Sequence, residues 1–132
     1  DAWIDKIAKL PTVSTFRNNN NKVVILSHAG YTPGIRPSTE DLLWDREHIY
    51  DPWPADSSDV IMVHGHTPIS YLKEQGVLKP PKVEKGDNLF YADGHKICID
   101  TGAVQSGVAV LLDLDTLELH RIYGHEWDYM FD

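Results

Sequence analysis

The chain has 132 residues, a formal net charge of −8 and one cysteine, Cys98. This length suits one domain, in which folding buries about two-thirds of the surface of the unfolded chain. The negative charge argues against a protein that binds the phosphate backbone of nucleic acids, because such proteins present a basic face. A single cysteine excludes an internal disulfide, and its position in an apolar run predicts a buried thiol.

The sequence also argues against a membrane partner. No apolar run approaches the roughly 20 residues that a transmembrane helix needs, and no charged-then-apolar leader opens the chain. We therefore expect a soluble, cytoplasmic domain. Three lysines do fall close together, but they share a proline-broken segment that we interpret as a solvated loop: Lys79, Lys82 and Lys85.

The first half of the chain predicts short helices between buried strands. Residues 2–10 have a weak helical period that Pro11 ends, and the polar run 18–21 predicts a turn before the first strand. The apolar runs 23–27 and 60–64 predict strands that are buried on both faces. Between them, a helix is expected to begin at Ser38, where Ser-Thr-Glu-Asp resembles a weak capping box, and to carry Arg46.

The second half predicts antiparallel sheet. A long connection is expected over 71–87, where two consecutive prolines exclude a helix. Half-exposed strands should follow, and Asp93-Gly94 and Asp115-Thr116 should form hairpin turns. The predicted strands cover residues 88–91, 96–100, 108–114 and 117–123. Together the two halves predict an α/β (α+β) fold, a mixed β-sandwich flanked by few helices.

Two histidines follow the two buried strands. His28 comes directly after the first, and His66 comes shortly after the second. Ligands of parallel sheets gather outside the carboxyl ends of the strands, and neutral imidazole commonly binds zinc, iron or manganese. The pair therefore indicates half of a metal site. Taken alone, each histidine could equally close a turn through a hydrogen bond.

Four segments carry a resemblance to one family. They read Ser-His-Ala-Gly-Tyr-Thr-Pro from residue 27, Leu-Leu-Trp-Asp-Arg-Glu from residue 42, Val-His-Gly-His-Thr-Pro from residue 63 and Ile-Cys-Ile-Asp-Thr-Gly-Ala-Val from residue 97. In this order and spacing they resemble the second half of the calcineurin-like metallophosphoesterases, in particular the bacterial and phage serine/threonine protein phosphatases. The resemblance runs from about residue 22 to about residue 121.

The resemblance implies roles for three side chains. His28 and His66 would bind one metal of a dinuclear centre of manganese, iron or zinc, and Arg46 would grip the substrate phosphate. Two such ions polarise a phosphoryl group and hold a nucleophilic hydroxide, and a guanidinium matches two phosphate oxygens. Without the resemblance, Arg46 reads as a solvated helix residue paired with Glu47 or Asp45.

Asp100 has two interpretations beside these residues. Within the resemblance, its carboxylate accepts backbone hydrogen bonds and ties down the loop beside the pocket. Alternatively, Asp100 joins His28 and His66 in a two-histidine, one-carboxylate site for a single metal. The remaining histidines are expected to be structural, on the surface or in packing: His48, His64, His95, His120 and His125.

The family's first-half motifs are absent ahead of His28. These are a D-x-H, a G-D-x-x-D-R-G, and a G-N-H-E or G-N-H-D that supplies the catalytic acid. Residues 93–95 spell D-x-H but read as a hairpin turn, and residues 86–88 lack the Asp-Arg-Gly that should follow. Residues 1–132 are therefore expected to be the carboxyl-terminal portion of a single metallophosphoesterase domain, which contains at most one partial metal site and no catalytic residue.

The expected activity is metal-dependent hydrolysis of phosphomonoesters, in particular phosphoserine or phosphothreonine in proteins. The expected partner is a phosphoprotein or a small phosphoester substrate. The chain alone should be inactive. A symmetrical dinucleoside tetraphosphatase, or an inactive fragment that binds a phosphorylated ligand or a protein, stays open. Unpaired sheet edges and apolar faces, capped in part by the aromatic tail 124–132, predict self-association.

An aspartic protease is a weaker alternative. Asp-Thr-Gly-Ala from residue 100 follows an apolar run, as in enzymes that share two aspartates across a homodimer. Such enzymes need a long β-rich stretch after this motif, but only 32 residues follow Asp100. The position of the motif therefore argues against a protease.

Overall fold

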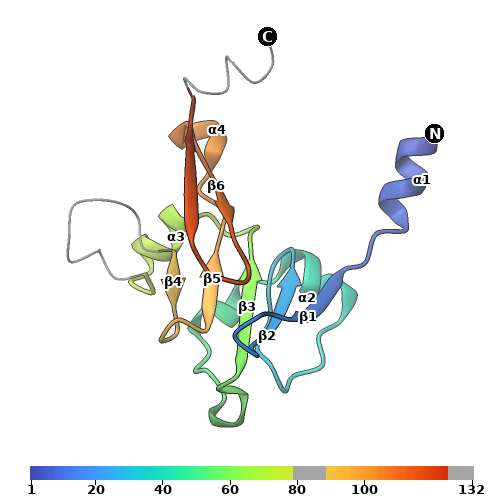
Figure 1. Cartoon of the computed structure of the whole chain (residues 1–132). Helices are drawn as coiled ribbons and strands as arrows, with labels where there is room; N and C mark the ends of the chain where they lie inside the picture. The colour runs from blue at the N-terminus through green and yellow to red at the C-terminus, as the bar shows by residue number, and fades with distance from the viewer. Residues whose placement is uncertain (79–88, 125–132) are drawn as a thin grey trace.

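A mixed five-stranded sheet forms the centre of the computed structural model, which describes residues 1–78 and 89–124 (Figure 1). Its order is β1-β2-β3-β5-β4, with β2, β3 and β5 parallel and the edge strands β1 and β4 antiparallel to their neighbours. The strands are β1 (Val13–Arg17), β2 (Val23–Ser27), β3 (Val60–His64), β4 (Phe90–Tyr91) and β5 (Lys96–Cys98). A mixed α/β architecture is thus confirmed.

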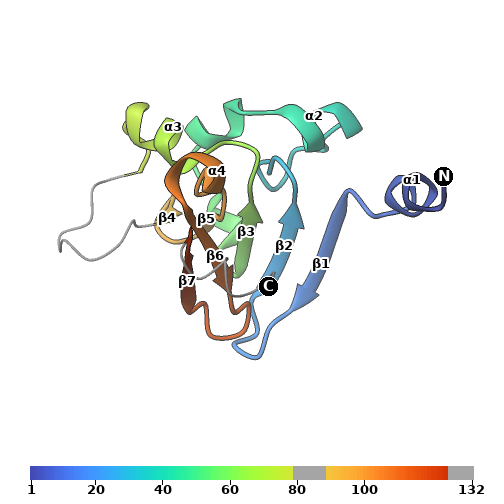
Figure 2. The same cartoon turned by 90° about the horizontal axis from the view of Figure 1, so that it is seen from above.

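Helices and a hairpin cover opposite sides of this sheet. Figure 2 shows α2 (Thr39–Trp44) and α3 (Ile69–Glu74) on one side, and the antiparallel hairpin of β6 (Val108–Leu112) and β7 (Leu119–Tyr123) on the other. Helix α1 (Ala2–Ala8) projects from the body and has no buried residue. The short elements are η1 (Glu47–Tyr50), η2 (Ala55–Ser57) and α4 (Ala103–Ser106). Within the described residues, no helix has the length and apolar character of a membrane span.

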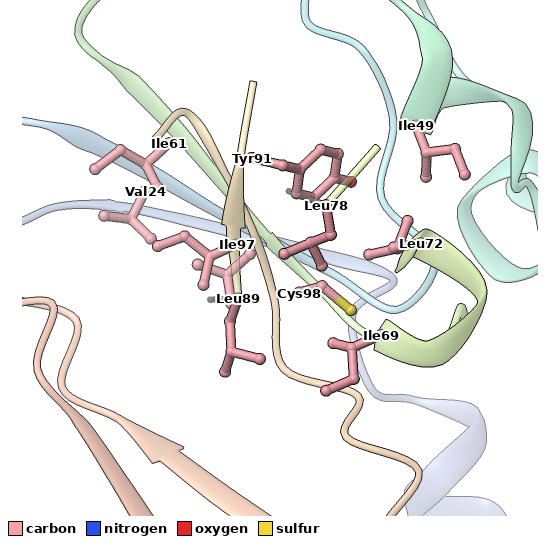
Figure 3. Close-up of a cluster of buried hydrophobic side chains, with 11 residues drawn as sticks. Val24, Ile49, Ile61, Ile69, Leu72, Leu78, Leu89, Tyr91, Ile97 and Cys98 are labelled. Atoms are coloured by element: carbon pink, nitrogen blue, oxygen red, sulfur yellow. The ribbon is translucent and has the colours of Figure 1, made fainter. Parts of the chain in front are cut away.

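The core joins the central strands to both covering layers. Strand β3 is buried from Ile61 to His64, as expected for a parallel strand with both faces covered. Figure 3 shows side chains from the sheet, α3 and η1 gathered in one cluster, against which apolar residues of the β6–β7 hairpin also pack. Its buried members are Val24, Ile49, Ile61, Val63, Ile69, Leu72, Leu78, Leu89, Tyr91, Ile97 and Cys98.

Both predicted hairpin turns are confirmed. Between β4 and β5, Ala92, Asp93 and Gly94 have φ of +50°, +55° and +85°. The Asp-Gly-His sequence is therefore a turn. Between β6 and β7, Asp113 Oδ1 accepts hydrogen bonds from the backbone N–H groups of Asp115 and Thr116, at 2.9 and 3.0 Å.

Residues 23–27 form a strand as predicted, but it is the second strand of the chain and not the first. Residues 13–17 form β1 ahead of it and pair with β2 from Val13 opposite Ser27 to Arg17 opposite Val23. Four of the five residues of β1 are exposed, so the sequence lacks the alternation of apolar and polar residues that marks a half-buried strand. The turn expected at 18–21 does form, and Asn18 Oδ1 accepts from the N–H groups of Asn20 and Lys22.

The expected helix over Arg46 is also wrong. Helix α2 begins after the Ser38 capping box, as predicted, but ends at Trp44. Asp45 adopts an extended conformation, and its carboxylate accepts hydrogen bonds from the N–H groups of Glu47 and His48. These side-chain bonds compete with helical backbone bonds and start the next turn. Arg46 therefore lies between α2 and η1.

The expected connection over 71–87 begins later than predicted, because α3 continues to Glu74. Its two prolines and the three lysines lie outside the described residues, as does the aromatic tail beyond Gly124. Strands β5, β6 and β7 are each shorter than the sequence indicates, and β5 is buried and pairs in parallel with β3, whereas the sequence predicts a half-exposed antiparallel strand.

We predict that Ser38→Ala lowers the free energy of unfolding by about 1 kcal/mol. Ser38 Oγ accepts from the Asp41 N–H at 3.1 Å, and Asp41 Oδ2 accepts from the Ser38 N–H at 2.8 Å. The substitution removes one half of this reciprocal cap. Urea denaturation should measure the loss, with Ser70→Ala at an exposed position in α3 as the control. Equal losses in both variants would contradict the role of the cap.

Candidate metal centre

His28 and His66 lie side by side beyond the carboxyl ends of β2 and β3. Their ring centroids are 5.0 Å apart, and the rings are tilted by 55°. Parallel pairing sets Ser27 opposite His64, and the Gly65 N–H donates to the His28 carbonyl at 2.9 Å. Both histidines thus occupy the sheet edge that the sequence indicates. Their role as metal ligands stays a prediction.

The backbone and ring of His66 are both constrained. Its φ is +62°, an uncommon left-handed conformation for a residue with a side chain. Its Nε2 lies 3.2 Å from the Trp44 carbonyl oxygen. Because a carbonyl only accepts, Nε2 carries the proton in this contact, and Nδ1 of the neutral ring keeps a lone pair for a metal.

The electrostatic surroundings of His66 favour its neutral form. Partial burial lowers the pKa of His66, and the positive charge of Arg46 and the neighbouring His28 lower it further. A metal binds only the neutral imidazole, so the lowered pKa suits a ligand. Arg46 itself is exposed, with Cζ 5.7 Å from the centroid of the Tyr71 ring on α3.

Asp100 fastens the loop after β5. Its Oδ1 accepts from the Gly102 N–H at 3.0 Å, and its carbonyl accepts from the Ile69 N–H at the start of α3, at 2.9 Å. The expectation that its carboxylate accepts a backbone hydrogen bond is confirmed. In the described parts of the chain, no three His, Cys, Asp or Glu side chains are grouped to hold a metal. The three-ligand site of His28, His66 and Asp100 is therefore not formed.

A buried polar cluster lies beneath the histidine pair. His48, His64 and Lys96 are 2%, 1% and 0% exposed, and His64 Nε2 lies 2.6 Å from the Tyr91 hydroxyl. Burial, with the positive charge of Lys96, lowers the pKa of His48 to about 4, and burial lowers that of Lys96 to about 8. His48 and His64 are packing residues, as expected. No local pattern indicates that Lys96 is buried, because lysine in a strand is ordinarily exposed.

Other expected residues have packing or surface positions. Cys98 is a free thiol and is buried, as predicted. Burial raises its pKa to about 12. His95 stacks on Trp53 with ring centroids 5.0 Å apart. His120 is exposed, and His125 lies outside the described residues.

An apolar groove of about 700 Å³ adjoins His28. Its lining includes Ile7 of α1, Leu26 of β2 and Val63 of β3, together with Leu10, which follows α1, and Ile99, which follows β5. Trp3 is 71% exposed and Ile99 is 40% exposed. These surfaces are the apolar faces on which the expected self-association depends, and self-association stays a prediction.

Comparisons with known proteins assign no family. No family model matches the chain. No curated protein matches it, and no solved structure matches it either. The assignment of a function therefore depends on the four sequence segments and on the geometry of His28, His66 and Arg46.

We predict that acid destabilises this protein in part through His48. Its pKa falls from 6.5 to about 4 on folding, so between these values the unfolded chain binds a proton that the folded chain excludes. The unfolding free energy should be highest above pH 6.5 and should fall as the pH drops toward 4, by about 3 kcal/mol from this residue.

The measurement is urea denaturation at several pH values. His48→Gln should flatten the dependence between pH 6.5 and 4, and His64 should supply part of the remaining slope, because its pKa is also lowered, to about 3. His120→Gln, at an exposed position, is the matched control. An unchanged slope in His48→Gln would show that the folded protein admits a proton there.

Proposed function

We propose that this chain is the carboxyl-terminal part of a metallophosphoesterase that hydrolyses phosphomonoesters, with phosphoserine or phosphothreonine in proteins as the substrate. The observation that carries the proposal is the adjacency of His28 and His66 at the ends of two parallel strands, with the charge of Arg46 close enough to lower the pKa of His66. The hairpin of β6 and β7 on one side of the sheet fits the start of the sandwich that such enzymes have.

The residues of this edge fit one divalent ion. Two imidazoles that bind one zinc ion through nitrogens about 2.1 Å away, at a tetrahedral angle, have ring centres about 5 Å apart. The observed 5.0 Å matches this spacing. Manganese and iron also accept imidazole nitrogen, so the donor set does not select among the three metals.

The chain's own residues would divide the work of binding. When bound, the metal pair supplies Lewis acidity and a nucleophilic hydroxide. His28 and His66 hold one ion at the sheet edge, with His66 oriented through its contact with the Trp44 carbonyl. Arg46, exposed above the ring of Tyr71, donates two N–H groups to the phosphate oxygens and compensates their charge. Further ligands and the general acid have to come from residues other than these.

We predict that the chain binds one zinc ion through both histidines. In a zinc titration followed by NMR, the ring protons of His28 and His66 should shift together and reach their end point at one equivalent. His66→Ala should weaken binding at least tenfold, because one ligand cannot chelate. His120→Ala should bind zinc as the wild type does. Independent shifts of the two rings would contradict a shared ion.

Turnover of a chromogenic phosphomonoester with manganese provides a second readout of the same variants. Two ligands form an incomplete centre, so we expect no turnover by this chain alone. Manganese-dependent turnover that His66→Ala abolishes would overturn the incomplete-site part of the proposal. Zinc binding without phosphate binding would instead favour a metal-binding module that is not an esterase.

We predict that Arg46→Ala weakens binding of inorganic phosphate to the zinc-loaded chain by about tenfold or more, since hydrogen bonds to charged groups contribute about 1.5–3 kcal/mol. Zinc affinity should stay unchanged. Calorimetric titration measures both. Arg17→Ala is the control, because Arg17 pairs with Val23 at the opposite end of the sheet. Equal phosphate affinity in the two variants would remove Arg46 from the site.

A further inference from the structure

The buried lysine beneath the histidine pair carries the inference. Lys96 on β5 is fully buried, a position that is costly for an ammonium group unless it is hydrogen-bonded. Its Nζ donates to the His48 carbonyl oxygen and lies 3.5 Å from His48 Nδ1 and 5.7 Å from the centroid of the Tyr91 ring. The charges of Asp51 and Asp45 also favour its protonated form. Lys96 thus holds both the backbone and the ring of His48.

The ring of His48 passes this constraint to the loop after β2. His48 Nε2 lies 2.7 Å from the Ala29 carbonyl oxygen. Because the carbonyl only accepts, Nε2 carries the proton, and Nδ1 of the neutral ring presents its lone pair toward the Lys96 ammonium. One tautomer therefore satisfies both contacts, and the order of donation runs from Lys96 through His48 to Ala29.

Gly30 fits the loop closely over this ring. A Cβ atom at Gly30 would lie 2.8 Å from His48 Cε1 and 2.9 Å from His48 Nε2, too close for any side chain. Gly30 also has φ of +86°, which glycine adopts without strain. The path of the chain directly after His28 is thus set by contact with the His48 ring.

We propose that Lys96 and His48 form a buried strut that positions His28 and Arg46 relative to each other. The ring of His48 holds the loop that follows His28, and its backbone, two residues after Arg46, is held by Lys96. The strut joins β5, the loop after β2 and η1, which begins directly after Arg46. Lys96 and His48 are positioning residues. Their effect on binding rests on the proposed function, whereas their effect on the loop does not.

The test compares two substitutions that break the strut with one that does not. Lys96→Met keeps an unbranched side chain of similar length but removes the amine, and His48→Leu removes both ring nitrogens. Tyr91→Phe is the matched control, because it removes a buried hydrogen bond to His64 in the same cluster and leaves the strut in place. His48→Gln can still donate to Ala29 and serves as the conservative rescue.

Amide hydrogen exchange of the metal-free protein is the first readout. Lys96→Met and His48→Leu should speed exchange at Ala29 and Gly30 by at least tenfold relative to Val63 in β3. Tyr91→Phe should leave this ratio of exchange rates unchanged. His48→Gln should retain most of the wild-type protection of Ala29 and Gly30. A uniform increase across the sheet, or no change at Ala29 and Gly30, would overturn the strut. If Lys96→Met does not fold, the comparison of His48→Leu with His48→Gln tests the strut by the same criterion.

Zinc affinity is the second readout. Loss of a residue that orients a ligand typically costs 10- to 100-fold in metal affinity, so Lys96→Met should weaken zinc binding by about tenfold while Tyr91→Phe should not. If the wild type binds no zinc, the proposed function fails, and the exchange data still decide the strut. If the wild type binds zinc and Lys96→Met binds it equally, the strut does not position the ligands and the proposed function stands.

Discussion

Parallel pairing of β2 with β3 is the constraint on which the candidate site depends. The register places Ser27 opposite His64, so β2 and β3 end side by side. The loops that carry His28 and His66 therefore leave the sheet next to each other. The Gly65 N–H extends the pairing by one hydrogen bond to the His28 carbonyl. A slip of one residue would turn every side chain of β3 to the other face, so that His64 would lose its hydrogen bond to the Tyr91 hydroxyl. Packing of the strands thus fixes the spacing of the two imidazoles.

The interior behind this edge is polar, in contrast to the rest of the core. Three ionisable side chains, His48, His64 and Lys96, are almost completely buried there. At neutral pH only Lys96 of these three carries a positive charge, because burial lowers the pKa of His48 to about 4 and that of His64 to about 3. The cluster therefore contributes one positive charge, that of Lys96, to a chain whose formal net charge is −8.

The sequence predicted those features that local patterns determine. The two continuous apolar runs, the Ser38 cap and the turn at Asp93 and Gly94 each depend on residues that are neighbours in the chain, and each is found. Strand β1 was missed because its exposed residues carry no burial pattern and its pairing partner, β2, supplies the information. Arg46 was misplaced because one carboxylate, that of Asp45, ends α2 early.

The candidate site was predictable only in part for the same reason. The rule that ligands gather at the carboxyl ends of parallel strands was enough to bring His28 and His66 together. Nothing local shows that Lys96, in a short strand after a turn, points into the interior toward His48. Such contacts join residues 48 positions apart and depend on the finished packing of three segments.

The buried thiol gives this protein an internal reporter. Cys98 is the only cysteine, and its Sγ donates to the carbonyl oxygen of Thr67, the residue that follows His66. Burial raises its pKa to about 12, so in the closed protein almost none of the reactive thiolate exists and no reagent reaches the sulfur. Alkylation of Cys98 therefore requires an opening that exposes its sulfur, such as separation of the loop of His66 from β5. The rate of that single reaction reports openings around the candidate site without an added label.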